Sequence, residues 1–320
     1  MNMTLEDVRG LADAIRTEMA KAIVGQDEVV DHLLIALMAG GHVLLEGPPG
    51  VAKTFLAQCF AQALGLDYGR IQFTPDLLPG DILGSNLFNF QTSQFTLTRG
   101  PVFCELLLAD EINRTPPKTQ AALLEAMQER RVTLDGQSHP LPDHFLVVAT
   151  QNPIESHGVY PLPEAQLDRF LFKLLVAYPD AAEEAAIVTR FGQRAGPQRP
   201  DEFGIAAITG ASRLSAAMNA VRGVTLAPEV VDYIVRLVRA TRDNADLSSG
   251  ASPRAAVLLA NAARARAALA GRDYVLPDDV KALANAVLRH RLLLSPAAEI
   301  EGREVEALVA GLIEQTEAPK

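Results

Sequence analysis

The stretch that most constrains this fold is residues 42–54, HVLLEGPPGVAKT. An apolar run around Leu44 leads into a turn rich in glycine and proline, and Lys53-Thr54 follow the turn. This order predicts a buried strand, a tight loop and the first turn of a helix. Backbone N–H groups in such a loop point at phosphate oxygens, and the N-terminal end of the helix favours the same anion. We interpret the stretch as a phosphate-binding loop; an ordinary strand, turn and helix with an exposed lysine is the alternative.

The residues of this loop have different predicted tasks. Lys53 is expected to reach the β- and γ-phosphates of a nucleotide, and the Thr54 hydroxyl to bind Mg²⁺. Ala52 departs from the usual spacing, which has a second glycine directly before the lysine. The predicted nucleotide-binding residues of the loop are Gly47, Pro48, Pro49, Gly50, Val51, Ala52, Lys53 and Thr54.

Composition places the chain among globular proteins. It has 320 residues, 48% apolar and 21% charged, which is enough apolar material for one large domain or two ordinary ones. The net charge of −10 argues against a protein that coats duplex nucleic acid, because such proteins carry a basic face.

The two cysteines, Cys59 and Cys104, are expected to be buried free thiols. We see neither a secretion signal nor a run of roughly 18 apolar residues, so we expect no membrane span and a cytoplasmic location.

A second apolar run ends in two acids. Residues 105–111, ELLLADE, are typical of a strand buried on both faces with carboxylates at its carboxyl end. Ligands bind at that end of the strands in open α/β sheets. Asp110 is therefore expected to bind Mg²⁺, and Glu111 to orient and deprotonate an attacking water. Without the phosphate-binding loop, two solvated acids at a strand end would be the simpler interpretation.

Two further positions are predicted to border the same site. The apolar strand 145–150 ends at Gln151-Asn152, which places Asn152 at the edge of the sheet that carries Asp110, within reach of a γ-phosphate and a water. By itself an asparagine before a proline is only a turn former. The break at Val24-Gly25 lies between two predicted helices just upstream of the loop. It is placed either to line an adenine pocket or to act as a simple turn.

The pattern of elements indicates two domains. Residues 192–200 are the most linker-like stretch, so we predict an N-terminal domain over 1–195 and a helical domain over 196–320. Alternating strands and helices in the first part predict a parallel α/β sheet. Its five candidate strands lie near 43–46, 70–73, 106–110, 145–150 and 171–176. Two hairpins are expected, one over 86–98 around Gln91-Thr92-Ser93, at the surface or an interface, and one over 131–139 around Asp135-Gly136.

Taken together, these motifs resemble those of an AAA+ ATPase, and most closely the MoxR family. The resemblance extends from about Ile23 to the helix after Pro277, and alanine is common in that family at the position of Ala52. The matching motifs are the loop 47–54, the acidic pair with Asn113-Arg114, Asn152 as first sensor, Asp168-Arg169-Phe170 as the arginine-finger segment, Ser252-Pro253-Arg254 as second sensor, and the two hairpins.

The resemblance implies a fold and an assembly. The implied fold is a P-loop NTPase of the AAA+ type, an αβα core with a five-stranded parallel sheet, followed by an all-α lid domain. The implied assembly is a homo-hexameric ring in which Arg169 completes the ATP site of the neighbouring subunit. Arg254 is implied to contact the γ-phosphate from the lid of its own chain. Arg114 is expected near the subunit interface, with a finger-like or a structural role.

The resemblance also implies a function. It is ATP hydrolysis with Mg²⁺, coupled to chaperone-like remodelling or maturation of a client protein complex, for example by metal insertion. The implied partner is a protein with a von Willebrand factor A domain. A subunit of a metal chelatase-like complex is an alternative with the same mechanics. A nucleic-acid motor is a further alternative, which the acidic balance and the few basic residues of the second hairpin disfavour.

Overall fold

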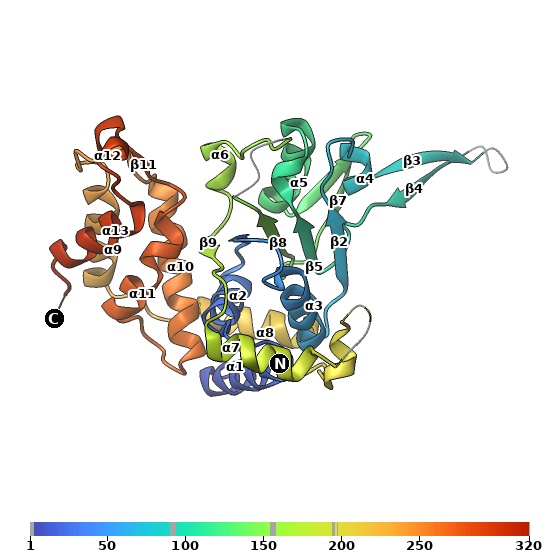
Figure 1. Cartoon of the computed structure of the whole chain (residues 1–320), viewed down its shortest axis with the longest axis horizontal. Helices are drawn as coiled ribbons and strands as arrows, with labels where there is room; N and C mark the ends of the chain where they lie inside the picture. The colour runs from blue at the N-terminus through green and yellow to red at the C-terminus, as the bar shows by residue number, and fades with distance from the viewer. Residues whose placement is uncertain (1–2, 90–93, 154–157, 194–195, 197, 320) are drawn as a thin grey trace.

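A parallel sheet of five strands forms the centre of the N-terminal part (Figure 1). The computed structural model describes residues 3–89, 94–153, 158–193, 196 and 198–319. The sheet order is β2 (Tyr68–Gln72), β5 (Leu106–Asp110), β8 (Leu146–Gln151), β1 (Val43–Glu46) and β9 (Phe172–Leu175), and all neighbours pair in parallel. The five predicted strands are confirmed. Because the strands are parallel, their carboxyl ends meet at one edge, where the loops after β1, β5 and β8 come together.

Helices cover both faces of this sheet. Successive strand residues point to opposite faces, so Leu45 and Leu106 join one apolar cluster, whereas Leu44 and Leu107 join the other. The first cluster includes residues of α1 (Leu5–Ala20), α2 (Asp27–Ala39) and α3 (Lys53–Leu64). The second includes Leu123, Leu124 and Met127 of α5 (Pro117–Glu129). Burial on both faces explains why the strands are apolar runs rather than alternating sequences.

Local signals set the helix ends. Thr4 caps α1 through a reciprocal capping box with Asp7, as its sequence predicts. Gly40 ends α2 in the left-handed conformation at φ 67°. Asp180 caps α7 (Ala181–Phe191) by accepting from two backbone N–H groups. Each cap fixes where the chain enters or leaves a helix that borders the sheet.

Both predicted hairpins are present. β3 (Gly84–Asn89) pairs with β4 (Gln94–Arg99) and projects from the body of the molecule beyond the short helix α4 (Pro79–Leu83) (Figure 1). β6 (Arg131–Leu134) pairs with β7 (Gln137–Pro140) around the predicted Asp-Gly turn. The Asn86 amide donates to Asp135 at 2.7 Å, so the two hairpins contact each other. The predicted turn at Gln91-Thr92-Ser93 lies outside the described residues.

The C-terminal part is helical, as expected, apart from a short antiparallel pair. That pair, β10 (Leu247–Ser249) and β11 (Leu293–Leu294), ties two lid loops together. The first helix after the linker, α8, packs beside α1 and α2 in the common apolar cluster. α10 also packs on α1 and α2, and α11 contacts β9, while α9, α12 and α13 lie further from the sheet (Figure 1). The boundary at residue 195 stays a prediction. The remaining elements are η1 (Ile112–Arg114), α6 (Glu164–Leu167), η2 (Pro200–Phe203), α8 (Ala211–Arg222), α9 (Pro228–Ala240), α10 (Pro253–Leu269), α11 (Pro277–Leu288), α12 (Pro296–Ile300) and α13 (Val305–Gln315).

Two sequence expectations concern the chain as a whole. Cys59 and Cys104 are buried free thiols, and burial raises the pKa of each to about 12, so both stay protonated. Within the described residues, every helix is too short or too polar to cross a membrane.

Candidate nucleotide-binding site

A cavity of about 760 Å³ lies at the carboxyl edge of the sheet. That volume is within the range of small-molecule sites. Its walls come from the loops after β1, β5 and β8, from the chain between α1 and α2, and from α7. Of the predicted site residues, those that line it are Val24, Gly25, Pro49, Gly50, Val51, Ala52, Lys53, Thr54, Asp110, Glu111 and Asn152.

The phosphate-binding loop has the backbone that its glycines allow. Gly50 has φ 85°, a left-handed conformation that glycine adopts without strain. A Cβ at Gly47 would lie 2.2 Å from the backbone oxygen of Val176, so only glycine fits there. Ala52 is also left-handed, at φ 59° and ψ 24°, immediately before α3. The usual glycine of this motif therefore corresponds to a real backbone requirement, which Ala52 meets at a conformational cost.

Lys53 lies inside the loop that precedes it. Its ammonium donates to the backbone oxygen of Gly47 at 2.5 Å and to that of Pro48 at 2.9 Å. These two loop residues are thereby in the site although they do not line the cavity. Burial lowers the pKa of Lys53, and the nearby carboxylates of Asp110, Glu111 and Glu46 oppose that shift. The two backbone oxygens thereby hold the lysine side chain over the loop.

Asp110 is the centre of a polar network. Its two carboxylate oxygens accept from Thr150 at 2.7 Å, from Thr54 at 3.1 Å and from Arg70 at 2.8 Å. The adjacent hydroxyl and carboxylate of Thr54 and Asp110 are hard oxygen donors that fit Mg²⁺, which typically takes one or two protein ligands beside water and phosphate oxygens. Among the described residues there is no cluster of three or more acidic, histidine or cysteine ligands. The donor set therefore suits a magnesium–nucleotide complex better than an all-protein metal cage.

Glu111 is held by neighbours on both sides. Its carboxylate accepts from the Gln72 amide at 2.8 Å and pairs with the Arg114 guanidinium at 3.0 Å. Its backbone is left-handed at φ 57°, and its N–H donates to Thr150 at 2.9 Å. A non-glycine residue in this conformation stores strain, which is found mostly at functional sites. The structure brings Glu111 to the cavity but leaves its carboxylate bound to two protein groups.

The other side of the cavity lies at Val24 and Gly25. A Cβ at Gly25 would lie 2.3 Å from the Glu183 side chain of α7, so the two segments touch closely. Gln26 donates to the backbone oxygen of Val51 at 2.9 Å, which joins this break to the phosphate-binding loop. On the opposite side, Asn152 is buried at the end of β8. The break is therefore part of the cavity and more than a connection between helices.

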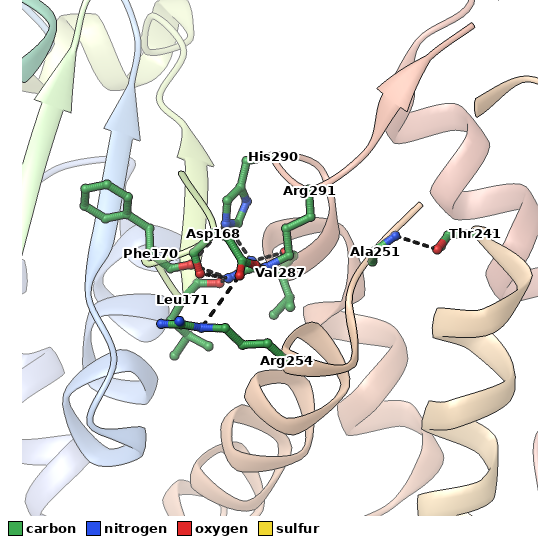
Figure 2. A network of polar contacts seen from close by, with 9 residues as sticks. All are labelled: Asp168, Phe170, Leu171, Thr241, Ala251, Arg254, Val287, His290 and Arg291. Atoms are coloured by element: carbon green, nitrogen blue, oxygen red, sulfur yellow. Dashed lines mark hydrogen bonds and ion pairs between the residues drawn. The ribbon is translucent and has the colours of Figure 1, made fainter. Parts of the chain in front are cut away.

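Two predicted residues lie elsewhere. Of the residues that the structure describes, neither Arg169 nor Arg254 lines the cavity. Arg254 pairs with Asp168 at 3.7 Å, at the N-terminal end of β9 (Figure 2). That end of the strand is opposite to the edge that carries the cavity. The start of α10 lies beside the Arg169 segment in this structure, and the expected contact of Arg254 with the nucleotide of its own chain stays a prediction.

Some residues of the site escape prediction from sequence. Arg70 and Gln72 bind the two acids from β2, and Thr150 binds Asp110 from β8. All three residues lie on the strands that flank β5. Their contacts with the acids could be predicted only if the strand order were already known. Arg291, in the loop after α11, bonds to the backbone around Arg169 and carries no motif.

Comparisons with known proteins agree with this architecture. A family profile described as "ATPase family associated with various cellular activities (AAA)" matches residues 42–172, and one described as "AAA lid domain" matches residues 239–311. The Chaperone MoxR1 of Mycobacterium tuberculosis (strain ATCC 25618 / H37Rv) is 44% identical, over 97% of this chain and 85% of that protein. The Protein MoxR of Methylorubrum extorquens is 31% identical, over 98% of this chain and 97% of that protein. A crystal structure of a candidate ATPase from Cytophaga hutchinsonii superposes with a TM-score of 0.90 at 39% identity, over 99% of this chain and 97% of that one. The chain belongs to the MoxR family of AAA+ ATPases.

Proposed function

We propose that this protein binds and hydrolyses ATP with Mg²⁺ in the cavity at the carboxyl edge of the sheet. The observation that carries the proposal is the convergence of Lys53, Thr54, Asp110 and Glu111 on one cavity from two separate segments. A lysine in a glycine-rich loop, a hydroxyl beside a carboxylate and a second acid are the groups that phosphoryl transfer requires. The family of the chain supports the same activity.

Each residue has a task in the proposed reaction. Lys53 and the backbone of residues 49–52 bind the phosphates, and Thr54 with Asp110 would hold Mg²⁺. Bound there, the metal ion neutralises charge on the phosphate oxygens. Glu111 accepts a proton from the attacking water, and Asn152 orients that water against the γ-phosphate. Because Gln72 and Arg114 bind Glu111 in this structure, the carboxylate must leave them before it acts.

The arginines complete the site in an assembly. Arg169 and Arg254 both lie at the Asp168 segment, away from the cavity of their own chain. We propose that both face the nucleotide of the next subunit in a homo-hexameric ring, where their charge stabilises the departing γ-phosphate. Arginines supplied in this way by a second protein are worth roughly 10³–10⁵ in rate in GTPases. Arg114, already paired with Glu111, has a structural role in this state.

The expected action of the ring is the remodelling of a protein partner. A relative that is 44% identical is named a chaperone, which supports this role. We propose a partner protein with a von Willebrand factor A domain and a client complex that matures through ATP turnover, including by metal insertion. The expected cytoplasmic location also stays a prediction. Capture of partners on the Glu111→Gln protein with ATP, but not on Lys53→Ala, tests this part.

Replacement of Glu111 tests the hydrolytic role. Glu111→Gln removes the proton acceptor and keeps the size of the side chain, so ATP turnover should fall at least about 100-fold. ATP affinity should change less than about threefold, because Lys53 and the loop remain. Phosphate release and binding of a fluorescent ATP analogue measure the two quantities.

The matched control is Glu125→Gln, an exposed glutamate on α5, which should leave turnover unchanged. Wild-type protein that releases no phosphate from Mg²⁺–ATP, or a Glu111→Gln protein as fast as wild type, contradicts the proposal.

A further inference from the structure

Arg291 is a lid residue whose side chain is buried against the N-terminal domain. Only 2% of that side chain is exposed, although it carries a full charge. Its Nε donates to Asp168 Oδ1 at 2.7 Å, and its Nη2 donates to the backbone oxygens of Asp168 at 2.9 Å and Phe170 at 2.6 Å. Its Nη1 faces the backbone oxygens of Leu171, at 3.4 Å, and Val287. One guanidinium thus binds the chain on both sides of Arg169.

These contacts of Arg291 fix the backbone around Arg169 and leave the Arg169 side chain free to bind a group outside its own chain. The Arg169 N–H donates to the backbone oxygen of Gln166 at 3.2 Å, while Arg291 holds the peptide oxygens of residues 168, 170 and 171. Within the described part of the chain, the Arg169 guanidinium has no hydrogen bond or ion pair. Arg169 is half-buried. A catalytic arginine needs this combination, because misplacement by about 1 Å can cost about 100-fold in rate.

Asp168 joins the same arrangement to Arg254. Its Oδ1 accepts from Arg291, and its Oδ2 lies 3.7 Å from the Arg254 Nε, so both lid arginines converge on one carboxylate (Figure 2). Burial lowers the pKa of Arg291 to about 10, and Asp168 opposes that shift, so the guanidinium stays charged at neutral pH. His290 is also buried here, and burial and Arg291 lower its pKa, so it stays neutral. The planar fork of an arginine suits this set of acceptors, and the single ammonium of a lysine does not.

We propose that Arg291 is a positioning residue for Arg169, so that the lid of one subunit sets the arginine delivered to the ATP site of the next. This inference rests on the proposed inter-subunit site. A brace that only holds the two domains of one chain together would make the same contacts. The difference is where a defect acts: a positioning residue impairs the neighbour's site, whereas a brace impairs the chain that carries it.

Mixed assemblies separate these two roles. Arg291→Lys should lower ATP turnover about 10- to 100-fold with an unchanged KM for ATP, because the loop of the same chain is intact. Co-expression of Arg291→Lys with Lys53→Ala, followed by purification on two different tags, gives mixed rings. In them, intact Arg169 segments of Lys53→Ala subunits face intact loops of Arg291→Lys subunits. Turnover should therefore exceed that of either variant alone several-fold.

Three comparisons make the outcome decisive. Arg169→Ala mixed with Lys53→Ala reports on the inter-subunit site itself, and its failure to recover overturns the proposed function. If turnover recovers in that mixture but not in the mixture of Arg291→Lys with Lys53→Ala, the positioning role of Arg291 is overturned and the proposed inter-subunit site stands. Arg272→Lys, which alters a lid arginine paired with Asp279 at 2.7 Å and remote from residue 169, should lower the melting temperature without reducing turnover.

A second variant covers a failure of Arg291→Lys to fold. Asp168→Asn removes the carboxylate shared by Arg254 and Arg291 but leaves the backbone acceptors of Arg291 in place. It should show a smaller loss of turnover and the same recovery when mixed with Lys53→Ala. A loss that does not recover in such mixtures contradicts the inference.

Discussion

At the scale of single residues, the site places two non-glycine residues in left-handed backbone. Ala52 has φ 59° and lies immediately before α3, and Glu111 has φ 57° and follows directly after β5; both line the cavity. An L-residue in this conformation costs about 1–2 kcal/mol relative to its preferred ones. Strained backbone of this kind is found mostly at functional sites, which agrees with the proposed roles of the loop and of Glu111.

Replacement of Ala52 tests this cost. Ala52→Gly should raise the free energy of unfolding by up to about 1 kcal/mol, since glycine adopts the conformation without strain but loses more entropy on folding. Ala52→Val should lower it by about 1–2 kcal/mol because β-branched residues tolerate positive φ worst. Urea unfolding of nucleotide-free protein measures both. Equal stability of the glycine and valine variants would contradict the left-handed assignment.

Residue types and spacing predicted Asp110, Glu111, Asn152 and the cavity-lining residues of the phosphate-binding loop, because these residues lie at or after the ends of predicted strands. Arg70 and Gln72 could not be found in that way. Their role depends on the register of β2 against β5, in which Gln72 stands opposite Asp110. The strand order β2-β5 is a property of the folded sheet, and the sequence of β2 by itself contains only an alternating polar pattern.

At the scale of elements, buried histidines tie the sheet to its helices. His42, just before β1, accepts from the Val147 N–H at 3.0 Å through Nδ1, so its Nε2 carries the proton and donates to the Met127 backbone oxygen at 3.1 Å. It thereby joins β1, β8 and α5. Burial, with the charge of Arg130, lowers the pKa of His42 to about 3. The strands around it were predicted from apolar runs, whereas this polar link was not.

The His42 pKa predicts acid sensitivity. In the folded protein this pKa is about 3, below the ordinary value of 6.5. The neutral imidazole therefore contributes its full stabilisation of the folded state above pH 6.5, and this contribution is lost as the pH falls toward 3. Each pH unit below 6.5 should cost about 1.4 kcal/mol of unfolding free energy for this group. His290 adds an effect of the same sign.

Urea unfolding between pH 7 and pH 5 measures that slope. His42→Gln should be less stable at pH 7 but should lose less stability between pH 7 and pH 5 than the wild type. The same slope in both proteins would mean that His42 is not buried in its neutral form.

At the scale of the whole molecule, the placement of the lid sets where its arginines lie relative to the cavity. The helical character of the lid was predictable from its apolar spacing and proline starts. Its position was not, because it depends on contacts between residues far apart in sequence, such as Arg291 with Asp168. Those contacts place Arg254 next to Arg169 rather than at the cavity. This placement is what the proposed inter-subunit site rests on, in which a neighbouring subunit supplies Arg169 and Arg254.

The most direct test of this shared site is turnover in mixed rings of Arg169→Ala and Lys53→Ala subunits. Each variant alone should hydrolyse ATP at least about 1,000-fold more slowly than wild type, because every site in its ring lacks one essential group. Mixed rings contain sites with an intact loop and an intact neighbouring arginine, so turnover should recover to a measurable fraction of wild type. Mixed rings of confirmed composition that stay as inactive as either variant would contradict an ATP site shared between subunits.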